Sequence, residues 1–121
     1  MSADKDLKLT NNFTKAEMAC QHCGLCLMGD GFMQKLQALR DAFGGPLTVT
    51  SGYRCRTHNT NVGGSPNSYH TKGRAADLQV PDKIEDAVRL MVLAQQIFPN
   101  AVQGPGFIHV DDGPKRKWSY T

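Results

Sequence analysis

The chain has 121 residues, and its 14 lysines and arginines against 11 acidic residues give a formal net charge of +3. This length corresponds to one domain that can bury its own core without needing disulfides. The basic residues are dispersed, which argues against nucleic acid as a partner, and no apolar run approaches the roughly 20 residues of a membrane span.

The N-terminal segment, residues 1–10, is polar and predicts a mobile lead ahead of a single domain at residues 11–121. It has no apolar stretch of the kind found in signal peptides, so we expect synthesis in the cytoplasm without such a signal. Thr14 and Glu17 then match a capping box, which predicts that a short helix begins there.

A second helix is expected to start at Asp30, acting as its cap, and to stop at residues 44–46, Gly-Gly-Pro. Its apolar side has helical spacing and comprises Phe32, Met33, Leu36, Leu39 and Phe43. Residues 47–50 read as a strand. Residues 52–68 are rich in Gly, Asn, Ser and Thr and predict a long ordered loop, where functional residues tend to lie.

Residues 74–80 predict another strand. Asp82 and Glu85 suggest a capping box that opens a helix to about Phe98, with a buried side of Ile84, Val88, Met91 and Ile97 or Phe98. Residues 101–103 and 107–111 are expected to form two closing strands joined by a Gly-Pro-Gly turn. The pattern predicts an α+β fold in which helices pack against a small, mainly antiparallel sheet.

Two histidines and one aspartate suggest a metal site. His70 follows the polar loop, Asp77 lies in an apolar strand, and His109 lies in a short β-branched and aromatic run. An aspartate inside an apolar strand is costly unless it is paired or bound to metal. Because strand side chains alternate, Ile108 and Val110 should face the core while His109 and Asp111 point together toward one site. Two imidazoles and a carboxylate form the ligand set of a catalytic zinc.

These residues occur in the motifs Ser-Gly-Tyr-Arg (51–54), His-Asn (58–59) and Ser-Tyr-His (68–70). Together they resemble the zinc D-Ala-D-Ala carboxypeptidase and endopeptidase family, in particular its small single-domain branch, over residues 13–118. The resemblance implies a fold of the hedgehog and D-Ala-D-Ala peptidase type, with zinc at one face. It also implies hydrolysis of peptide bonds involving D-amino acids in peptidoglycan stem peptides, by a carboxypeptidase or an endopeptidase. We expect the protein to act on the cell wall, as a phage lysin or virion component or as a bacterial enzyme exported by a non-standard route.

The resemblance assigns roles to individual residues. It makes His70, Asp77 and His109 the zinc ligands, and Ser68 a residue that binds substrate. Arg54 would bind substrate and stabilise the developing oxyanion, as a fixed guanidinium can.

The chain departs from the family at one position. Many members have a glutamate general base three residues before the last histidine ligand, and here that residue is Gly106. Asp111 is the nearest ionisable residue on the expected face of its strand. We therefore expect Asp111 to act either as the base or as the residue that orients His109.

The four cysteines leave three possibilities open. Cys20, Cys23 and Cys26 have knuckle-like spacing, and Cys55 follows Arg54. They could hold a structural zinc, with His22 replacing one thiol, form a disulfide such as one to Cys55, or remain free.

Two other functions are compatible with the sequence. A binding or structural module of the same fold could retain its zinc without hydrolysis, which the Gly106 departure favours. A cysteine-zinc nucleic-acid binder is the weaker alternative. We expect a monomer whose partner is peptidoglycan, with no nucleic acid and no membrane.

Overall fold

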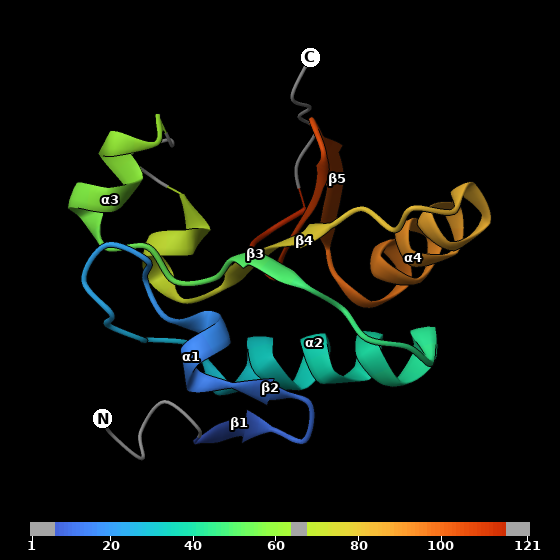
Figure 1. Cartoon of the computed structure of the whole chain (residues 1–121), viewed down its shortest axis with the longest axis horizontal. Coiled ribbons are helices and arrows are strands. Elements are labelled where there is room, and N and C mark those ends of the chain that lie inside the picture. Colours follow the sequence, from blue (N-terminus) through green and yellow to red (C-terminus); the bar gives the residue numbers. More distant parts are fainter. Residues whose placement is uncertain (1–6, 64–67, 116–121) are drawn as a thin grey trace.

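The computed structural model describes residues 7–63 and 68–115. Its main sheet has the strand order β3-β4-β6-β5, and every neighbouring pair is antiparallel (Figure 1). These strands are β3 (Val49–Ser51), β4 (Ala75–Gln79), β5 (Asn100–Gly104) and β6 (Phe107–Asp111). A second sheet pairs β1 (Lys8–Thr10) with β2 (Phe13–Thr14). The expected α+β fold with a small antiparallel sheet is confirmed.

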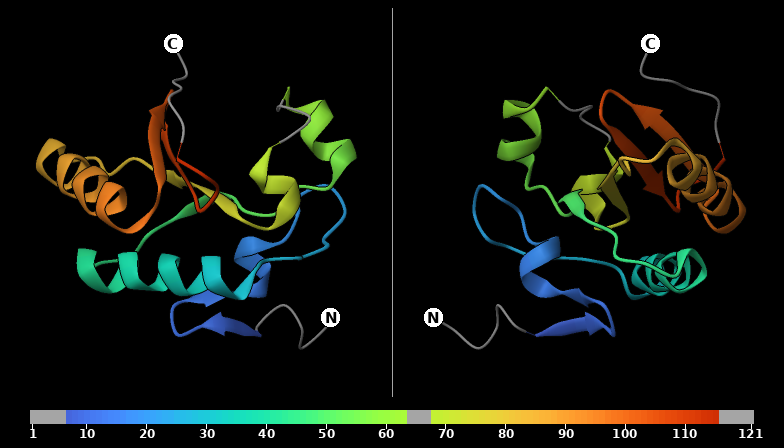
Figure 2. Two further views of the ribbon diagram at one scale, coloured as in Figure 1. Left: turned by 180° about the vertical axis from the view of Figure 1, so that it is seen from behind. Right: turned by 45° about the vertical axis from the view of Figure 1, so that its right-hand side comes forward.

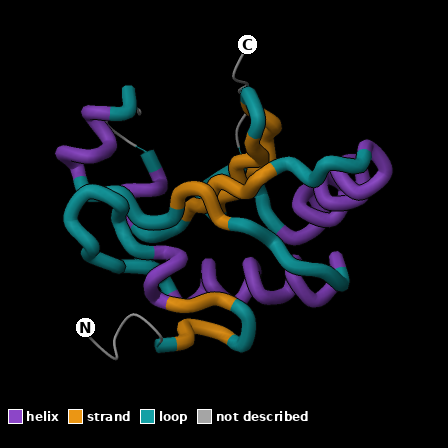
Figure 3. Tube along the Cα trace, in the orientation of Figure 1, coloured by secondary structure: helices purple, strands orange, loops and turns teal. Residues whose placement is uncertain are grey.

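The helices are distributed around this sheet (Figure 3). They are α1 (Lys15–Met18), α2 (Asp30–Phe43), α3 (Arg56–Asn61), the 3-10 helix η2 (Tyr69–Lys72) and α4 (Ile84–Ile97). Residues from α2 and α4 form one hydrophobic core with Ala76 and Leu78 of β4 and Ile108 and Val110 of β6. The α3 and η2 helices lie together at the opposite end of the molecule from α4 (Figure 2). None of the helices in the described ranges is long and apolar enough to cross a membrane.

The N-terminal elements largely follow their sequence signals. The Thr14 hydroxyl accepts from the Glu17 backbone N–H, and the Glu17 carboxylate accepts from the Thr14 backbone, so the capping box of α1 is confirmed. Residues 8–10, expected in the mobile lead, instead form β1, while residues 1–6 lie outside the described ranges.

Helix α2 has the expected buried side but a different start. Phe32, Met33, Leu36 and Leu39 are buried. Asp30 is the first helical residue rather than the cap; Gly29 occupies the cap position, with no side-chain hydrogen bond. Gly44 ends the helix at φ 75°, a left-handed conformation that suits glycine.

Helix α4 corrects two expectations. Lys83 takes the cap position without a side-chain hydrogen bond, so the Asp82 and Glu85 capping box does not form. Ile84 and Val88 are 75% and 57% exposed, whereas Leu90 and Ala94 are fully buried. Phe98 is buried, and Met91 and Ile97 pack against the core, so the expected side is right toward the end of the helix and wrong at its start. Packing against α2 decides which apolar residues are covered.

The polar loop also differs from expectation because it contains α3. The Cys55 sulfur accepts a hydrogen bond from the His58 backbone N–H at 3.4 Å and so caps the helix. Its sequence, Arg-Thr-His-Asn-Thr-Asn, has no apolar periodicity that would indicate a helix. Residues 64–67 of the expected loop lie outside the described ranges.

Candidate metal centre

The sheet register places Asp77 and His109 side by side. They are direct partners in the antiparallel pair of β4 and β6. Side chains of such partners project from the same face of a sheet. Their neighbours Leu78 and Ile108 project into the hydrophobic core on the other face. The alternation expected for residues 107–111 is therefore present: Ile108 and Val110 are in the core, and His109 and Asp111 are in contact on the other face.

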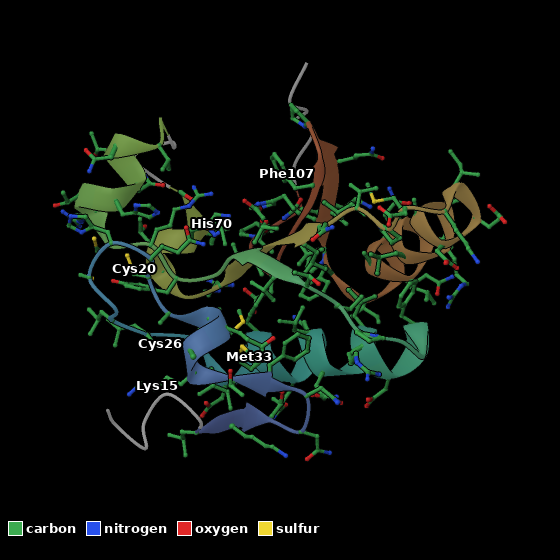
Figure 4. The ribbon with its side chains drawn as sticks, in the orientation of Figure 1. Lys15, Cys20, Cys26, Met33, His70 and Phe107 are labelled. Carbon is green, nitrogen blue, oxygen red and sulfur yellow. The ribbon has the colours of Figure 1, made fainter. Side chains whose placement is uncertain are left out.

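His70 reaches the same place from η2, and Figure 4 shows it beside the strands, on the side of the molecule that carries α3. The Ser68 hydroxyl accepts from the His70 backbone N–H at 3.2 Å, which starts the 3-10 turn. The His70 ring donates from Nδ1 to the Gly52 carbonyl oxygen at 2.8 Å. Its Nε2 is therefore left facing Asp77, 3.1 Å from Oδ1.

The three residues form a compact donor set. One ligand atom each from His70, Asp77 and His109 can be chosen so that all lie within 4.8 Å of one another. All three side chains are buried, with exposed fractions of 2%, 5% and 4%. Two imidazole nitrogens and a carboxylate oxygen, converging in a buried position, fit the ligand set of a catalytic zinc.

Asp111 completes the surroundings of His109. Its Oδ2 accepts from His109 Nε2 at 2.7 Å, which leaves His109 Nδ1 facing Asp77 Oδ1 at 3.0 Å. The other oxygen, Oδ1, accepts from Asn100 Nδ2 at 2.9 Å and from the Gly113 backbone N–H at 3.0 Å. Asp111 is fully buried. Metal-binding histidines are commonly oriented by such a carboxylate on the second ring nitrogen.

The protonation balance of the site favours positive charge. Burial would raise the pKa of the Asp77 carboxyl, but hydrogen bonds to His109 and His70 hold that pKa well below its usual range. Burial would also lower the pKa of His109, whereas its hydrogen bonds to Asp111 and Asp77 raise it above its ordinary value. A bound divalent cation would stabilise the buried carboxylates in the same way as a positively charged histidine does.

Arg54 is fixed beside the centre by three partners. Nε donates to Ser51 Oγ at 3.0 Å, Nη1 to Asn59 Oδ1 at 3.3 Å, and Nη2 to Asp77 Oδ2 at 3.1 Å. Its side chain remains 15% exposed. The guanidinium is thus held in one orientation and still reaches solvent.

The structure brings most of the sequence-predicted residues together. His70, Asp77, His109, Asp111 and Arg54 form one connected network of hydrogen bonds and ion pairs. The Ser68 hydroxyl contacts the backbone of His70. Gly106 lies in the β5–β6 turn at φ +79°, where a glutamate would be strained, so glycine suits the conformation of this turn.

Three residues that orient the side chains of the site were not predicted from the sequence. Gly52 and Asn59 lie within quoted motifs, but nothing in the sequence indicated that the Gly52 carbonyl would orient His70 or that Asn59 would hold Arg54. Asn100, which fixes Asp111, carries no local signal; its role depends on the register of β5 against β6, where it is the partner of Asp111.

Comparison with known proteins shows the family to which this chain belongs. A family model for peptidase M15 matches residues 9–111. The chain belongs to this family, which confirms the resemblance inferred from its motifs. A zinc D-Ala-D-Ala carboxypeptidase of Streptomyces albus G is 40% identical over 94 residues, which cover 72% of this chain and 36% of that protein.

A second relative is more distant. The peptidoglycan L,D-endopeptidase MepK of Escherichia coli strain K12 is 29% identical over 100 residues, which cover 73% of this chain and 53% of that protein. The chain therefore spans between about a third and a half of the length of these curated relatives.

Proposed function

We propose that this protein is a zinc peptidase that hydrolyses peptide bonds involving D-amino acids in peptidoglycan stem peptides. The observation that carries the proposal is the buried convergence of His70, Asp77 and His109 in a member of the peptidase M15 family. The names of both relatives specify peptidases, one acting on D-Ala-D-Ala and the other on peptidoglycan. Both names specify bonds that involve a D-amino acid, and one of them specifies peptidoglycan as the substrate.

His70, Asp77 and His109 would hold the zinc. When bound, zinc polarises a scissile carbonyl and lowers the pKa of a water molecule. The Gly52 carbonyl and the Asp111 carboxylate keep the two imidazoles in the tautomers that direct their remaining nitrogens at Asp77. The ligand set is thus oriented before substrate arrives, and this reduces the cost of reorganisation during reaction.

Arg54 is the residue proposed to bind substrate and to stabilise negative charge that grows on the carbonyl oxygen. Its guanidinium is preorganised by Ser51 and Asn59, and such a fixed cation acts most strongly where charge develops in the transition state. Ser68 is proposed to help hold the substrate at the mouth of the site. Its hydroxyl also shapes the turn that carries His70.

For Asp111 we propose the orienting role. Both of its oxygens already accept hydrogen bonds, and the side chain is fully buried. A carboxylate in that position can keep His109 aligned but has no free oxygen directed at a substrate.

Digestion of purified peptidoglycan tests the proposal. Zinc-loaded protein is expected to create new termini next to D-amino acids, identified by mass spectrometry of the released fragments. Asp77→Asn should abolish this activity, while Asp86→Asn, which removes a half-exposed carboxylate on α4, should not. Absence of new termini with the zinc-loaded wild-type protein would contradict the peptidase function.

The same digestion distinguishes the peptidase from the alternative function, a zinc-binding module that does not hydrolyse peptides. The glycine at position 106 favours that alternative. That module would bind zinc and leave peptidoglycan intact. The proposed setting is the bacterial cell wall, with a phage lysin or virion component as the expected form. Release of soluble fragments from isolated walls, or of single D-amino acids from their stem peptides, would support this setting, and release of neither would count against it.

A further inference from the structure

A second group of metal-binding side chains lies outside the centre described above. Sulfur atoms of Cys20, Cys23 and Cys55 all lie within 4.8 Å of one another, and all three cysteines are free. Cys20 and Cys23 come from the loop after α1, and Cys55 comes from the start of α3. Two segments far apart in sequence thus bring three thiols to one point.

The loop after α1 is folded around Cys20. The Cys20 backbone N–H donates to the Leu25 carbonyl at 2.7 Å, and the Gly24 N–H donates to the Cys20 carbonyl at 2.8 Å. Gly24 has φ +75°, the left-handed conformation that lets the chain turn back directly after Cys23. This turn brings the Cys23 thiol into the group with Cys20.

The surroundings of the Cys20 sulfur stabilise a negative charge on it. The Cys55 backbone N–H donates to Cys20 Sγ at 3.4 Å. Thiolates rather than thiols are the metal ligands, and a backbone N–H directed at a sulfur supports the negative charge of a thiolate.

A histidine, and not the remaining cysteine, lies next to one of these thiols, that of Cys55. His22 Nδ1 lies 3.6 Å from Cys55 Sγ, and the exposed ring stacks on His58. Cys26 is not a member of the group; it packs against the edge of the hydrophobic core, and Figure 4 shows it on the Lys15 side of the loop, apart from Cys20. Of the arrangements considered from sequence, this geometry favours the one in which His22 replaces one thiol.

We propose that Cys20, Cys23, Cys55 and His22 bind a second, structural zinc ion. Three thiolates and one imidazole make a closed tetrahedral shell, which is typical of structural rather than catalytic zinc. Binding releases the thiol protons to solvent and involves no change of oxidation state. The site goes beyond the proposed peptidase function and uses none of its ligands.

The position of this site gives it a structural consequence. Cys55 directly follows Arg54, and the Tyr53 N–H donates to the Met18 carbonyl at 2.8 Å. A zinc ion between Cys20 and Cys55 would therefore fasten the loop after α1 to the segment that carries Arg54 and the Gly52 carbonyl. The second site would stabilise the surroundings of the first without touching substrate.

Metal content after anaerobic, reducing purification tests the proposal. Elemental analysis is expected to find two zinc ions per wild-type chain and one in Cys23→Ser. Cys26→Ser is the matched control and should keep two. Cys23 is exposed, so its replacement by serine should not disturb the core, and circular dichroism checks the fold.

Cobalt provides a readout that does not depend on hydrolysis of peptidoglycan. Cobalt(II) bound to thiolates gives an intense sulfur-to-metal charge-transfer band in the near ultraviolet, whereas His70, Asp77 and His109 contain no sulfur. We expect the wild-type protein and Cys26→Ser to show this band and Cys23→Ser to lose most of it. His22→Ala should bind zinc more weakly in competition with a chromophoric chelator.

Two results would overturn the second site. One is a wild-type protein without the band in which all four thiols react freely. The other is a protein without the band in which two thiols are missing because a disulfide has formed. Either result would leave the peptidase proposal intact, since that is judged by peptidoglycan digestion. Conversely, a protein that shows the band but does not cut peptidoglycan would support only the second site.

Discussion

At the scale of single residues, Asp77 is where the parts of the site meet. Its Oδ1 faces both imidazoles, and its Oδ2 accepts from Arg54. One carboxylate thus connects the proposed metal ligands with the proposed oxyanion-binding residue. The orientation of each partner is fixed by a further group, so changes at these outer groups should alter the chemistry without removing a ligand.

Replacing Arg54 with lysine should keep the charge but lose the planar fork that contacts Ser51, Asn59 and Asp77 together. We expect kcat on a stem-peptide substrate to fall by about ten- to a thousandfold, as when an oxyanion donor is removed. Zinc content should remain unchanged, because the three proposed ligands are intact. Arg89→Lys, on the exposed surface of α4, serves as the control. Wild-type turnover in Arg54→Lys would make Arg54 a structural residue.

Replacing Asp111 with asparagine tests its two possible roles. If Asp111 orients His109, zinc affinity should fall by about ten- to a hundredfold, because an amide supports the ring less well than a carboxylate. Competition with a chromophoric chelator measures this affinity. A variant with unchanged zinc affinity and strongly reduced kcat would instead identify Asp111 as the general base.

At the scale of elements, β6 and α4 show what a local pattern can and cannot predict. The alternation along β6 correctly separated Ile108 and Val110 from His109, because a strand has only two faces. The side expected to be buried on α4 was wrong for Ile84 and Val88 but right for Phe98, because apolar residues share helical spacing on more than one side and tertiary packing selects among them. Helix α3 was missed since its cap is a cysteine and its sequence is polar.

The burial on α4 leads to a paired prediction. Leu90→Ala should lower the free energy of unfolding by about 2–5 kcal/mol, because Leu90 is fully buried and its loss leaves a cavity. Val88→Ala, at a position that is 57% exposed, should change it by no more than about 0.5 kcal/mol. Urea unfolding of both variants measures the difference. Equal losses would show that the wrong side of α4 had been taken as buried.

At the scale of the whole molecule, the site depends on segments that no local pattern joins. The sheet register pairs Asp77 with His109, but His70 and Arg54 reach them from a 3-10 turn and a loop. Their assembly was predictable only through the family motifs. The choice of ring nitrogen and the support from Asn100 and the Gly52 carbonyl could not be predicted, since both depend on atomic placement across the fold.

Metal removal should therefore destabilise the entire domain. A metal that binds only the native state adds about 2.7 kcal/mol at a free concentration one hundred times its dissociation constant. We expect thermal unfolding to begin at lower temperature in the presence of a chelator and to recover when zinc is restored. Repeating the experiment in Cys23→Ser isolates the contribution of His70, Asp77 and His109. An unchanged midpoint in that variant would mean that these residues do not hold the metal in the folded protein.

The strand order also bears on when the protein can acquire its metal during synthesis. Strand β6 lies inside the sheet, between β4 and β5, and His109 comes 32 residues after Asp77. At roughly 5–20 residues per second, a ribosome adds that stretch in about 2–6 seconds. Through this interval the nascent chain has two of the proposed ligands, His70 and Asp77, but not the third. Complete coordination and closure of the sheet thus become possible at the same moment, so metal supply cannot guide the earlier part of the chain through this site.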